Sequence, residues 1–254
     1  MSIKNKRLAV VASCLLAAMG CSATVLAQQS VDSESGWKNS LIIYLLAPTI
    51  EGKVGIGPID GDMDIDARTV FDTLDGAFLA TYAVEKDSWG AVFDLIYMDL
   101  SEDVTGKRIP LTGEIGVKQM IFGASAAYRL NDNLQVLFGG RYVDLTNRFT
   151  LNLPNPAKFK VDESWIDPTV GLRLAGPIGE RWSYGVLGDI GGFGVGCDFT
   201  WQLTGTLSVR MTEHSLFTFG YRYLDFDYES GKGRDRFKFD VAQHGPALGF
   251  RFDF

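Results

Sequence analysis

The stretch Phe199-Thr-Trp-Gln-Leu-Thr-Gly-Thr-Leu-Ser-Val-Arg-Met211 alternates apolar and polar residues over its whole length. Successive side chains of a β-strand point to opposite faces. One face would carry Trp201, Leu203, Gly205, Leu207, Val209 and Met211, and the other Gln202, Thr204, Thr206, Ser208 and Arg210. The polar face holds small hydroxyl residues rather than the Lys and Glu typical of a soluble sheet, which favours a narrow lumen. The stretch therefore predicts a barrel strand whose apolar face contacts lipid.

A second stretch, 113–130, repeats the pattern with one irregularity. Its apolar face would hold Met120, Phe122, Ala124, Ala126, Tyr128 and Leu130, and its polar face Gln119, Gly123, Ser125 and Arg129. Ile121 falls on the polar face and is an exception to the alternation. Aromatic residues also gather near the expected strand ends and turns, as membrane-interface girdles require: Trp89, Tyr97, Tyr128, Tyr142, Trp165, Trp182, Tyr184, Trp201, Tyr221 and Tyr223.

Turn-forming segments divide the rest of the chain into hairpins. Short polar turns at 85–88, 131–133, 176–180 and 212–215 alternate with longer polar segments at 53–76, 102–112, 151–160, 191–198 and 229–236. Short turns on one side and long loops on the other are typical of bacterial transmembrane barrels, which have an even strand number. About ten strands are expected: 37–50, 77–86, 89–101, 113–130, 134–150, 161–175, 181–190, 199–211, 215–228 and 237–254.

The predicted fold is thus an all-β, transmembrane, up-and-down antiparallel barrel. Eight to twelve strands remain possible, because residues 53–68 could pair as a further hairpin and the glycine-rich residues 191–196 could be a bend within one strand.

The N-terminal residues 1–27 have the layout of a secretory signal peptide. Lys4, Lys6 and Arg7 precede an apolar run that ends at Ala27, where we expect cleavage; lipoprotein processing at Cys21 is the alternative. The barrel domain would then be 28–254. Removal of three of the 24 basic residues and none of the 31 acids changes the net charge from −7 to −10.

This acidic balance argues against nucleic acid as a partner, because phosphate binding needs clustered Lys and Arg. Cys197 would be the only cysteine of the mature chain, so no intrachain disulfide is expected. No later run of 18 or more apolar residues occurs, which excludes a helical membrane protein. A closed barrel remains as the membrane-spanning solution.

The C-terminus reads Pro246-Ala-Leu-Gly-Phe-Arg-Phe-Asp-Phe254, with Phe250, Phe252 and Phe254 on one face. This resembles the last strand of outer-membrane barrel proteins. Gly139-Gly-Arg-Tyr-Val-Asp144 and Gly220-Tyr-Arg-Tyr-Leu-Asp225 also resemble strands of small barrels in the style of the OmpA and OmpW groups. The resemblance spans nearly the whole mature chain. It implies location in the cell outer membrane, contact with lipid bilayer and lipopolysaccharide, and recognition of the terminal phenylalanines by the barrel-assembly machinery.

Strand parity places seven charged residues on the lumen face: Asp94, Arg141, Asp167, Arg173, Asp189, Arg222 and Arg251. Charges in a narrow lumen must pair, since an isolated buried charge costs several kcal/mol. Asp167 and Arg173 share a face at even spacing and are expected to form an ion pair. The set predicts an ionic plug; a gated or selective polar path is the alternative. Ten strands are too few for a wide diffusion pore.

No other motif indicates catalysis, a cofactor or a resident metal. Asp60-Gly-Asp-Met-Asp-Ile-Asp66 lacks the Gly and Glu of an EF-hand register, and is expected to be a solvated acidic loop, with divalent-cation bridging to lipopolysaccharide as the alternative. His214 and Ser215 are adjacent, so they would point to opposite faces of a strand. Gly191–Gly196 lacks the strand and helix context of a nucleotide loop.

The sequence therefore predicts a non-enzymatic outer-membrane barrel with a charge-plugged lumen that serves envelope integrity or surface interaction. Two alternatives are a narrow channel or transporter for a small hydrophobic or polar solute, and a lipid-modifying enzyme.

Overall fold

The computed structural model describes residues 36–105, 112–152 and 157–254. The expected signal peptide, residues 1–27, lies outside the described residues, as does its alternative processing site at Cys21. Among the described residues, no helix has the length and hydrophobicity needed to cross a bilayer.

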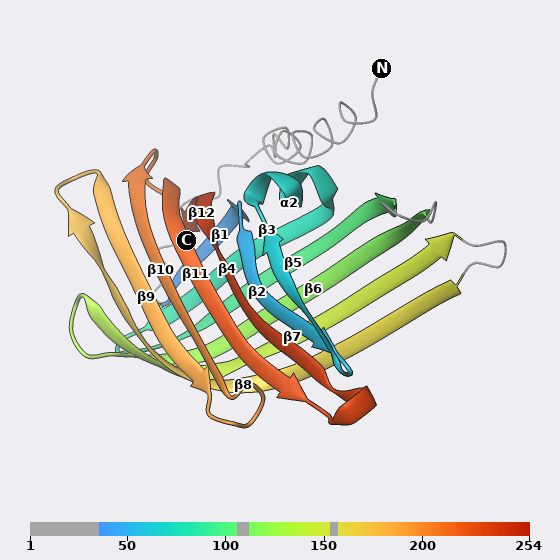
Figure 1. Cartoon of the computed structure of the whole chain (residues 1–254). Helices are drawn as coiled ribbons and strands as arrows, with labels where there is room; N and C mark the ends of the chain where they lie inside the picture. Colours follow the sequence, from blue (N-terminus) through green and yellow to red (C-terminus); the bar gives the residue numbers. More distant parts are fainter. Residues whose placement is uncertain (1–35, 106–111, 153–156) are drawn as a thin grey trace, which may run out of the picture. The chain divides into compact units, whose positions relative to one another are not determined.

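Nearly all of the described chain is antiparallel sheet (Figure 1). The strands are β1 (Lys38–Leu46), β2 (Thr49–Ile56), β3 (Ile59–Ile65), β4 (Leu74–Lys86), β5 (Trp89–Thr105), β6 (Thr112–Arg129), β7 (Leu134–Asn152), β8 (Ala157–Ile178), β9 (Trp182–Gly192), β10 (Phe199–Arg210), β11 (Ser215–Ser230) and β12 (Phe237–Asp253). Helix α2 (Ala67–Thr73) follows β3, and a 3-10 turn, η1 (Gly233–Asp235), precedes β12.

Ten of these strands close into a ring. From β4 to β12 each strand pairs with the next, and β1 pairs with both β4 and β12. Closure pairs each of these strands on both sides over most of its length, so most of their backbone groups are satisfied by their neighbours. The predicted all-β antiparallel barrel of about ten strands is confirmed.

The predicted first strand, 37–50, is interrupted at Ala47 and Pro48. Residues on both sides keep one register along β12, with Leu46 opposite Ala247 and Thr49 opposite His244. Proline has no N–H for the ladder. The chain then turns back as the β2–β3 hairpin, so the further hairpin that the sequence left open is present and the expected loop 53–76 is largely sheet and helix.

The barrel wall has a seam where β3 and β4 face each other. The other edge of β3 and residues Leu74–Leu79 of β4 pair with no further strand in the described part of the chain, because β1 reaches only Ala80. Helix α2 joins these two strands at this point. Asp66 caps its N-terminus by accepting a hydrogen bond from the Thr69 N–H at 2.7 Å, and Val70 is buried. The helix thus contributes an apolar side chain to the interior.

The strands extend further than predicted on the long-loop side. β5 continues to Thr105, β7 to Asn152, and β8 begins at Ala157. Residues 102–105, 112, 151–152 and 157–160, which were expected to lie in loops, are therefore strand; residues 106–111 and 153–156 lie outside the described part of the chain. Short turns remain on the other side, toward the left of Figure 1.

Both faces of the barrel wall change character part of the way along β11. The outward face of β11 carries Phe217, Phe219, Tyr221 and Tyr223, and then Asp225, Asp227 and Glu229. Its inward face carries Thr218, Gly220 and Arg222, and then Leu224, Phe226 and Tyr228. The short-turn half is consequently apolar outside and polar inside, whereas the long-loop half has the opposite arrangement.

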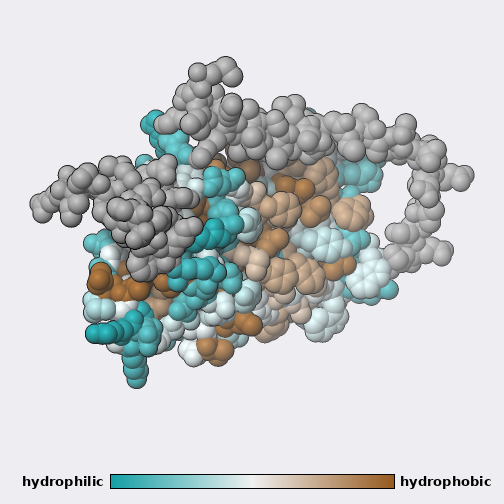
Figure 2. Space-filling model, turned by 90° about the vertical axis from the view of Figure 1, so that its right-hand side faces the viewer, coloured by the Kyte–Doolittle hydropathy of each residue, from teal (hydrophilic) through white to brown (hydrophobic). Residues whose placement is uncertain are grey.

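The outward apolar belt of the short-turn half is formed by exposed side chains from all around the ring, among them Ile43, Phe78, Phe93, Phe122, Phe138, Leu172, Val186, Leu203 and Leu248. Figure 2 shows hydrophobic side chains gathered into a continuous field on one face, beside a hydrophilic one. Trp89 and Tyr128 pack edge to face near the short turns, with ring centroids 4.9 Å apart. Trp165 was predicted to belong to a girdle, and this is wrong: its side chain is 6% exposed inside the barrel. The alternation of residues along a strand did not predict that the inner face becomes apolar in the long-loop half.

Candidate functional site in the barrel lumen

The lumen contains three successive layers, which we name by position. The mouth lies nearest the short turns and contains Glu85, Arg129, Gln135, Arg173, Arg210, Arg251 and Asp253. The mid-barrel network contains Tyr44, Thr81, Asp94, Arg141, Asp189, Thr200, Gln202 and Arg222. The apolar plug, in the long-loop half, contains Ile96, Met98, Ile121, Val143, Leu145, Trp165, Leu224, Phe226, Tyr228, Phe237, Phe239 and Val241, with Val70 from α2.

One side of the mid-barrel network is built around Arg141 on β7. Its guanidinium donates to Asp189 Oδ1 at 2.6 Å and to Thr200 Oγ1 at 3.0 Å. The amide of Gln202 donates to the other oxygen of Asp189. The Arg141 side chain is only 4% exposed, so its charge depends on these partners.

The other side is built around Arg222 on β11. It donates from one nitrogen to Asp94 Oδ2 at 2.8 Å and to the Tyr44 hydroxyl at 2.9 Å, and from another to Gln202 Oε1 at 2.8 Å. Asp94 also accepts from Thr81 Oγ1 at 2.7 Å and from the Tyr44 hydroxyl at 3.2 Å. Gln202 therefore links the two ion pairs into one chain of hydrogen bonds across the lumen.

The same short motif positions both arginines. In Gly139-Gly-Arg-Tyr-Val-Asp144 and Gly220-Tyr-Arg-Tyr-Leu-Asp225, the arginine points inward and the following tyrosine outward. A Cβ at Gly139 would meet the carbonyl oxygen of Ala124, and a Cβ at Gly220 that of Gly205, so the neighbouring strand approaches too closely for a side chain. Each arginine lies at the level where the inner face changes from polar to apolar and the outer face from apolar to polar.

The apolar plug lies beyond this network, in the long-loop half of the barrel. Trp165 stacks on Tyr228 with ring centroids 3.9 Å apart, and it packs edge to face with Phe226 with ring centroids 6.2 Å apart. Arg141 lies over the Phe226 ring at 6.0 Å, which joins the charged layer to the aromatic one. Ile121, the exception in the sequence pattern, is 1% exposed within this plug. Its position is explained by the apolar interior of the long-loop half.

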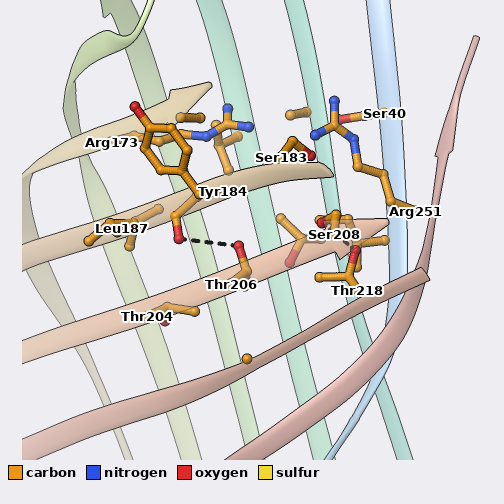
Figure 3. A pocket seen from close by; sticks show the side chains of 18 of the residues that line it. Ser40, Arg173, Ser183, Tyr184, Leu187, Thr204, Thr206, Ser208, Thr218 and Arg251 are labelled. Carbon is orange, nitrogen blue, oxygen red and sulfur yellow. Dashed lines mark hydrogen bonds between the residues drawn. The ribbon is translucent and has the colours of Figure 1, made fainter. Parts of the chain in front are cut away.

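The mouth lines a cavity of about 610 Å³. Glu85 accepts from Arg129, from Gln135 Nε2 at 3.1 Å and from Arg173 at 3.2 Å. Arg251 donates to Asp253 at 2.7 Å. The hydroxyl residues Thr204, Thr206, Ser208 and Thr218 line the same space (Figure 3). The cavity continues out to exposed turn residues, so it opens at the short-turn end.

The seven predicted lumen residues divide among these layers. Asp94, Arg141, Asp189 and Arg222 form the mid-barrel network, and Arg173 and Arg251 lie at the mouth. The predicted pair between Asp167 and Arg173 is wrong. Six residues along a strand separate them by about 20 Å. Asp167 instead accepts from Trp165 Nε1 at 3.0 Å and from the Cys197 N–H at 2.6 Å, whereas Arg173 pairs with Glu85.

Sequence reasoning missed Glu85, Tyr44 and Gln202 as members of the lumen site. Glu85 lies in both the expected strand 77–86 and the expected turn 85–88, and the inward face of β4, which ends at Lys86, carries Thr81, Ala83 and Glu85. The parity of that strand was the available signal. Tyr44 was predictable from the parity of β1, because it lies two residues beyond the inward position Ile42 and four beyond Ser40.

The acidic segment 60–66 is not a loop, because it forms most of β3. Asp60 accepts from Arg236 at 2.6 Å, and this hydrogen bond lowers the pKa of Asp60. Arg236 also binds Glu229 at 2.9 Å and lowers its pKa. In the described ranges, no group of three or more His, Cys, Asp or Glu side chains has a geometry that could hold a metal ion.

The segments His214-Ser215 and 191–196, which were weighed as possible motifs, form turns held by hydrogen bonds. The Ser215 hydroxyl lies 2.7 Å from the Thr212 hydroxyl, in the turn between β10 and β11. The glycine-rich residues end β9 and turn toward β10, where the Gly194 N–H donates to the Cys197 carbonyl at 3.0 Å.

No protein-family model matches the sequence, and no curated protein matches it. Several solved structures of bacterial outer-membrane barrels are similar in fold. The translocator domain of the autotransporter NalP from Neisseria meningitidis has a TM-score of 0.47 and 13% identity, over 98% of this chain and 97% of that one. Ail, the attachment invasion locus protein of Yersinia pestis, has a TM-score of 0.38 and 12% identity, over 85% and 99%.

A FadL homologue from Pseudomonas aeruginosa has a TM-score of 0.38 and 10% identity, over 86% of this chain and 90% of that one. With TM-scores below 0.5 and identities of 10–13%, these structures single out no subfamily.

Proposed function

We propose that the chain is a non-enzymatic outer-membrane barrel whose lumen is closed to solutes, and that it serves envelope integrity or surface interaction. The proposal rests on two layers of the lumen, the mid-barrel network and the apolar plug. The mid-barrel network crosses the lumen, and the apolar plug fills it on the long-loop side. Interlocked side chains of this kind leave no continuous aqueous path.

The outward surface supports a membrane position for the short-turn half. Apolar side chains that would be costly in water are stable against hydrocarbon, and aromatic residues suit its two interfaces. On β7 the outward residues Val136, Phe138 and Tyr142 precede Asp144 and Thr146. The long-loop half, with polar residues outside and the apolar plug inside, is built like a water-soluble protein. It would project from the outer leaflet.

Membrane location is tested by expressing the chain and separating the two membranes. We expect the protein in the outer-membrane fraction, with a gel mobility that changes on boiling, because closed barrels resist detergent until heated. A protein that is soluble without detergent and shows no heat-dependent shift would contradict the assignment.

Closure is tested by liposome swelling with small neutral sugars. Liposomes that contain the folded chain should swell no faster than empty ones. The Arg222→Ala/Asp94→Ala variant serves as the comparison, since it removes one ion pair of the network. Rapid swelling with the wild-type chain would instead support the second candidate, a narrow channel, for which the open cavity at the mouth could be one half of the path.

The partners follow from the same placement. The belt would contact lipid, and the projecting half would lie among lipopolysaccharide. Phe254 follows β12 directly, and 67% of its surface is exposed. If the assembly machinery reads this residue, Phe254→Ser will reduce the heat-shifted fraction in cells but not the unfolding free energy of the purified, refolded chain. Equal assembly in cells would contradict this role. The lipid A and phospholipid profiles should not change on overexpression.

A further inference from the structure

We propose that the mouth cavity is a binding site for a small phosphate-bearing solute that enters from the short-turn end. The cavity, of about 610 Å³, is within the range of small-molecule sites in proteins. Its closed end is the mid-barrel network, so a solute that enters has no exit on the other side. The geometry is that of a pocket rather than a passage.

The cavity is rich in arginine although the chain as a whole is acidic. The whole chain has a net charge of −7. Its lining nevertheless includes seven arginines and six carboxylates, and two of those carboxylates, Asp132 and Glu180, lie in exposed turns at the entrance. The inward positions of the strands alone carry six arginines and four carboxylates. The interior of the cavity therefore favours an anion.

The carboxylates inside the cavity are already engaged, but many arginine donors are not. A guanidinium has five N–H donors. Among the described residues, Arg251 donates only through Nε, and Arg173 only through one terminal nitrogen. Arg210 has no ion pair within the described part of the chain and is exposed to the cavity. Figure 3 shows the guanidinium groups of Arg173 and Arg251 within the pocket. These donors are available to a ligand.

An independent observation comes from the inner end of the cavity. The Arg222 side chain is 8% exposed, and its Nε atom is buried without a hydrogen-bond partner. An unpaired buried donor costs about 1–3 kcal/mol, so such groups usually have a ligand or water as partner. Arg222 lines the inner end of the cavity, which places a nearly buried guanidinium with one unpartnered donor beside the proposed site.

Phosphate matches this set of donors better than a neutral solute. It offers several acceptor oxygens and negative charge, and arginine binds it through paired N–H groups. The hydroxyls of Thr204, Thr206 and Ser208 add donors along one wall (Figure 3). The volume leaves room for an organic group, which indicates a phosphate monoester rather than phosphate alone.

The test is calorimetry with the folded chain in a maltoside detergent, which carries no phosphate. The titrants are glycerol phosphate, inorganic phosphate, glycerol and a short-chain phosphatidylglycerol. We expect saturable binding of glycerol phosphate, weaker binding of inorganic phosphate and none of glycerol. Tighter binding of the lipid than of glycerol phosphate would overturn the free solute as the ligand and identify a lipid headgroup instead.

Variants locate the site. Arg210→Gln and Arg251→Gln should each weaken glycerol phosphate binding at least fivefold, whereas Arg68→Gln, on the exposed surface of α2, should not change it. Arg210 has no ion pair to lose, so its variant should fold normally, which the heat-dependent gel shift will verify. The absence of saturable binding, or full affinity in the Arg210→Gln/Arg251→Gln double variant, would overturn the proposal. Neither result affects lumen closure, which liposome swelling measures separately.

Discussion

Arg222 and Asp94 show how a charged pair is kept in the middle of the barrel. Arg222 is nearly buried, and its partners include a carboxylate, a tyrosine hydroxyl and an amide oxygen. Removing one member of a buried pair leaves the other charge unpaired, which typically costs about 3–5 kcal/mol. We therefore expect Arg222→Met to lower the free energy of unfolding by about that amount, measured by urea denaturation in lipid vesicles.

The double variant Arg222→Met/Asp94→Asn serves as the control, because it leaves no isolated charge. Its loss should be smaller than the sum of the two single losses by about 0.5–3 kcal/mol. Additive losses would mean that the 2.8 Å ion pair has no energetic coupling.

Phe226 tests the apolar plug at the same scale. Its side chain is fully buried between Trp165 and Phe239, with ring centroids 6.2 and 6.0 Å away. Deletion of a buried phenylalanine ring leaves a cavity and costs about 3–5 kcal/mol. Phe226→Ala should show a loss of this size in the same unfolding measurement. Phe138→Ala removes the same ring from the outward belt, where lipid fills the space, and should cost much less. Equal losses would contradict a packed interior.

At the scale of single residues, parity found charged positions but not their partners. Arg141, Asp94, Asp189 and Arg222 could be assigned to the lumen because each lies on the polar face of an alternating strand. Which charge meets which depends on strand tilt and register, and these are properties of the closed barrel. The pair of Asp167 with Arg173 was wrong for a simpler reason: the two residues share a face but lie six residues apart along one strand, which is too far for contact.

Helix α2 is the element that joins the two strands at the seam. Val70 is 2% exposed and belongs to the same core as Ile96 and Met98. An aspartate at this position would place an unpaired charge in the apolar plug. We expect Val70→Asp to release the helix and to speed tryptic cleavage after Arg68 at least tenfold, because a locally opened segment is cut in proportion to its open population.

Asp72→Asn is the matched control, since Asp72 is exposed on the same helix. Its cleavage rate should equal that of the wild-type chain. If Val70→Asp is cut no faster than this control, α2 does not depend on the interior for its position.

At the scale of elements, alternation predicted the strands well but assumed one polarity along each of them. Between Arg222 and Leu224 the inward residues change from polar to apolar and the outward residues from apolar to polar. The alternation of period two therefore continues, but its apolar residues now point inward. The irregular Ile121 and the recurring Gly-x-Arg-Tyr-x-Asp motif were the visible signs of this reversal. The β2–β3 hairpin was harder to predict, because its acidic residues are typical of a solvated loop.

For the whole molecule, the two halves serve different surroundings. In the function that we propose, the short-turn half would bury its apolar surface in lipid, whereas the long-loop half packs its apolar residues against one another inside the barrel. On this account the lumen is closed because the second half needs a core, and the mid-barrel network satisfies the polar groups where that core begins. Closure is thus a consequence of how the projecting half is stabilised.

Single-channel recording of the folded wild-type chain in a planar bilayer tests this closure most directly. With both the mid-barrel network and the apolar plug in place, we expect no reproducible conductance steps at moderate voltage in concentrated potassium chloride. Regular, uniform conductance steps from the purified wild-type chain, absent from detergent and empty-bilayer controls, would show an open path and contradict the closed lumen.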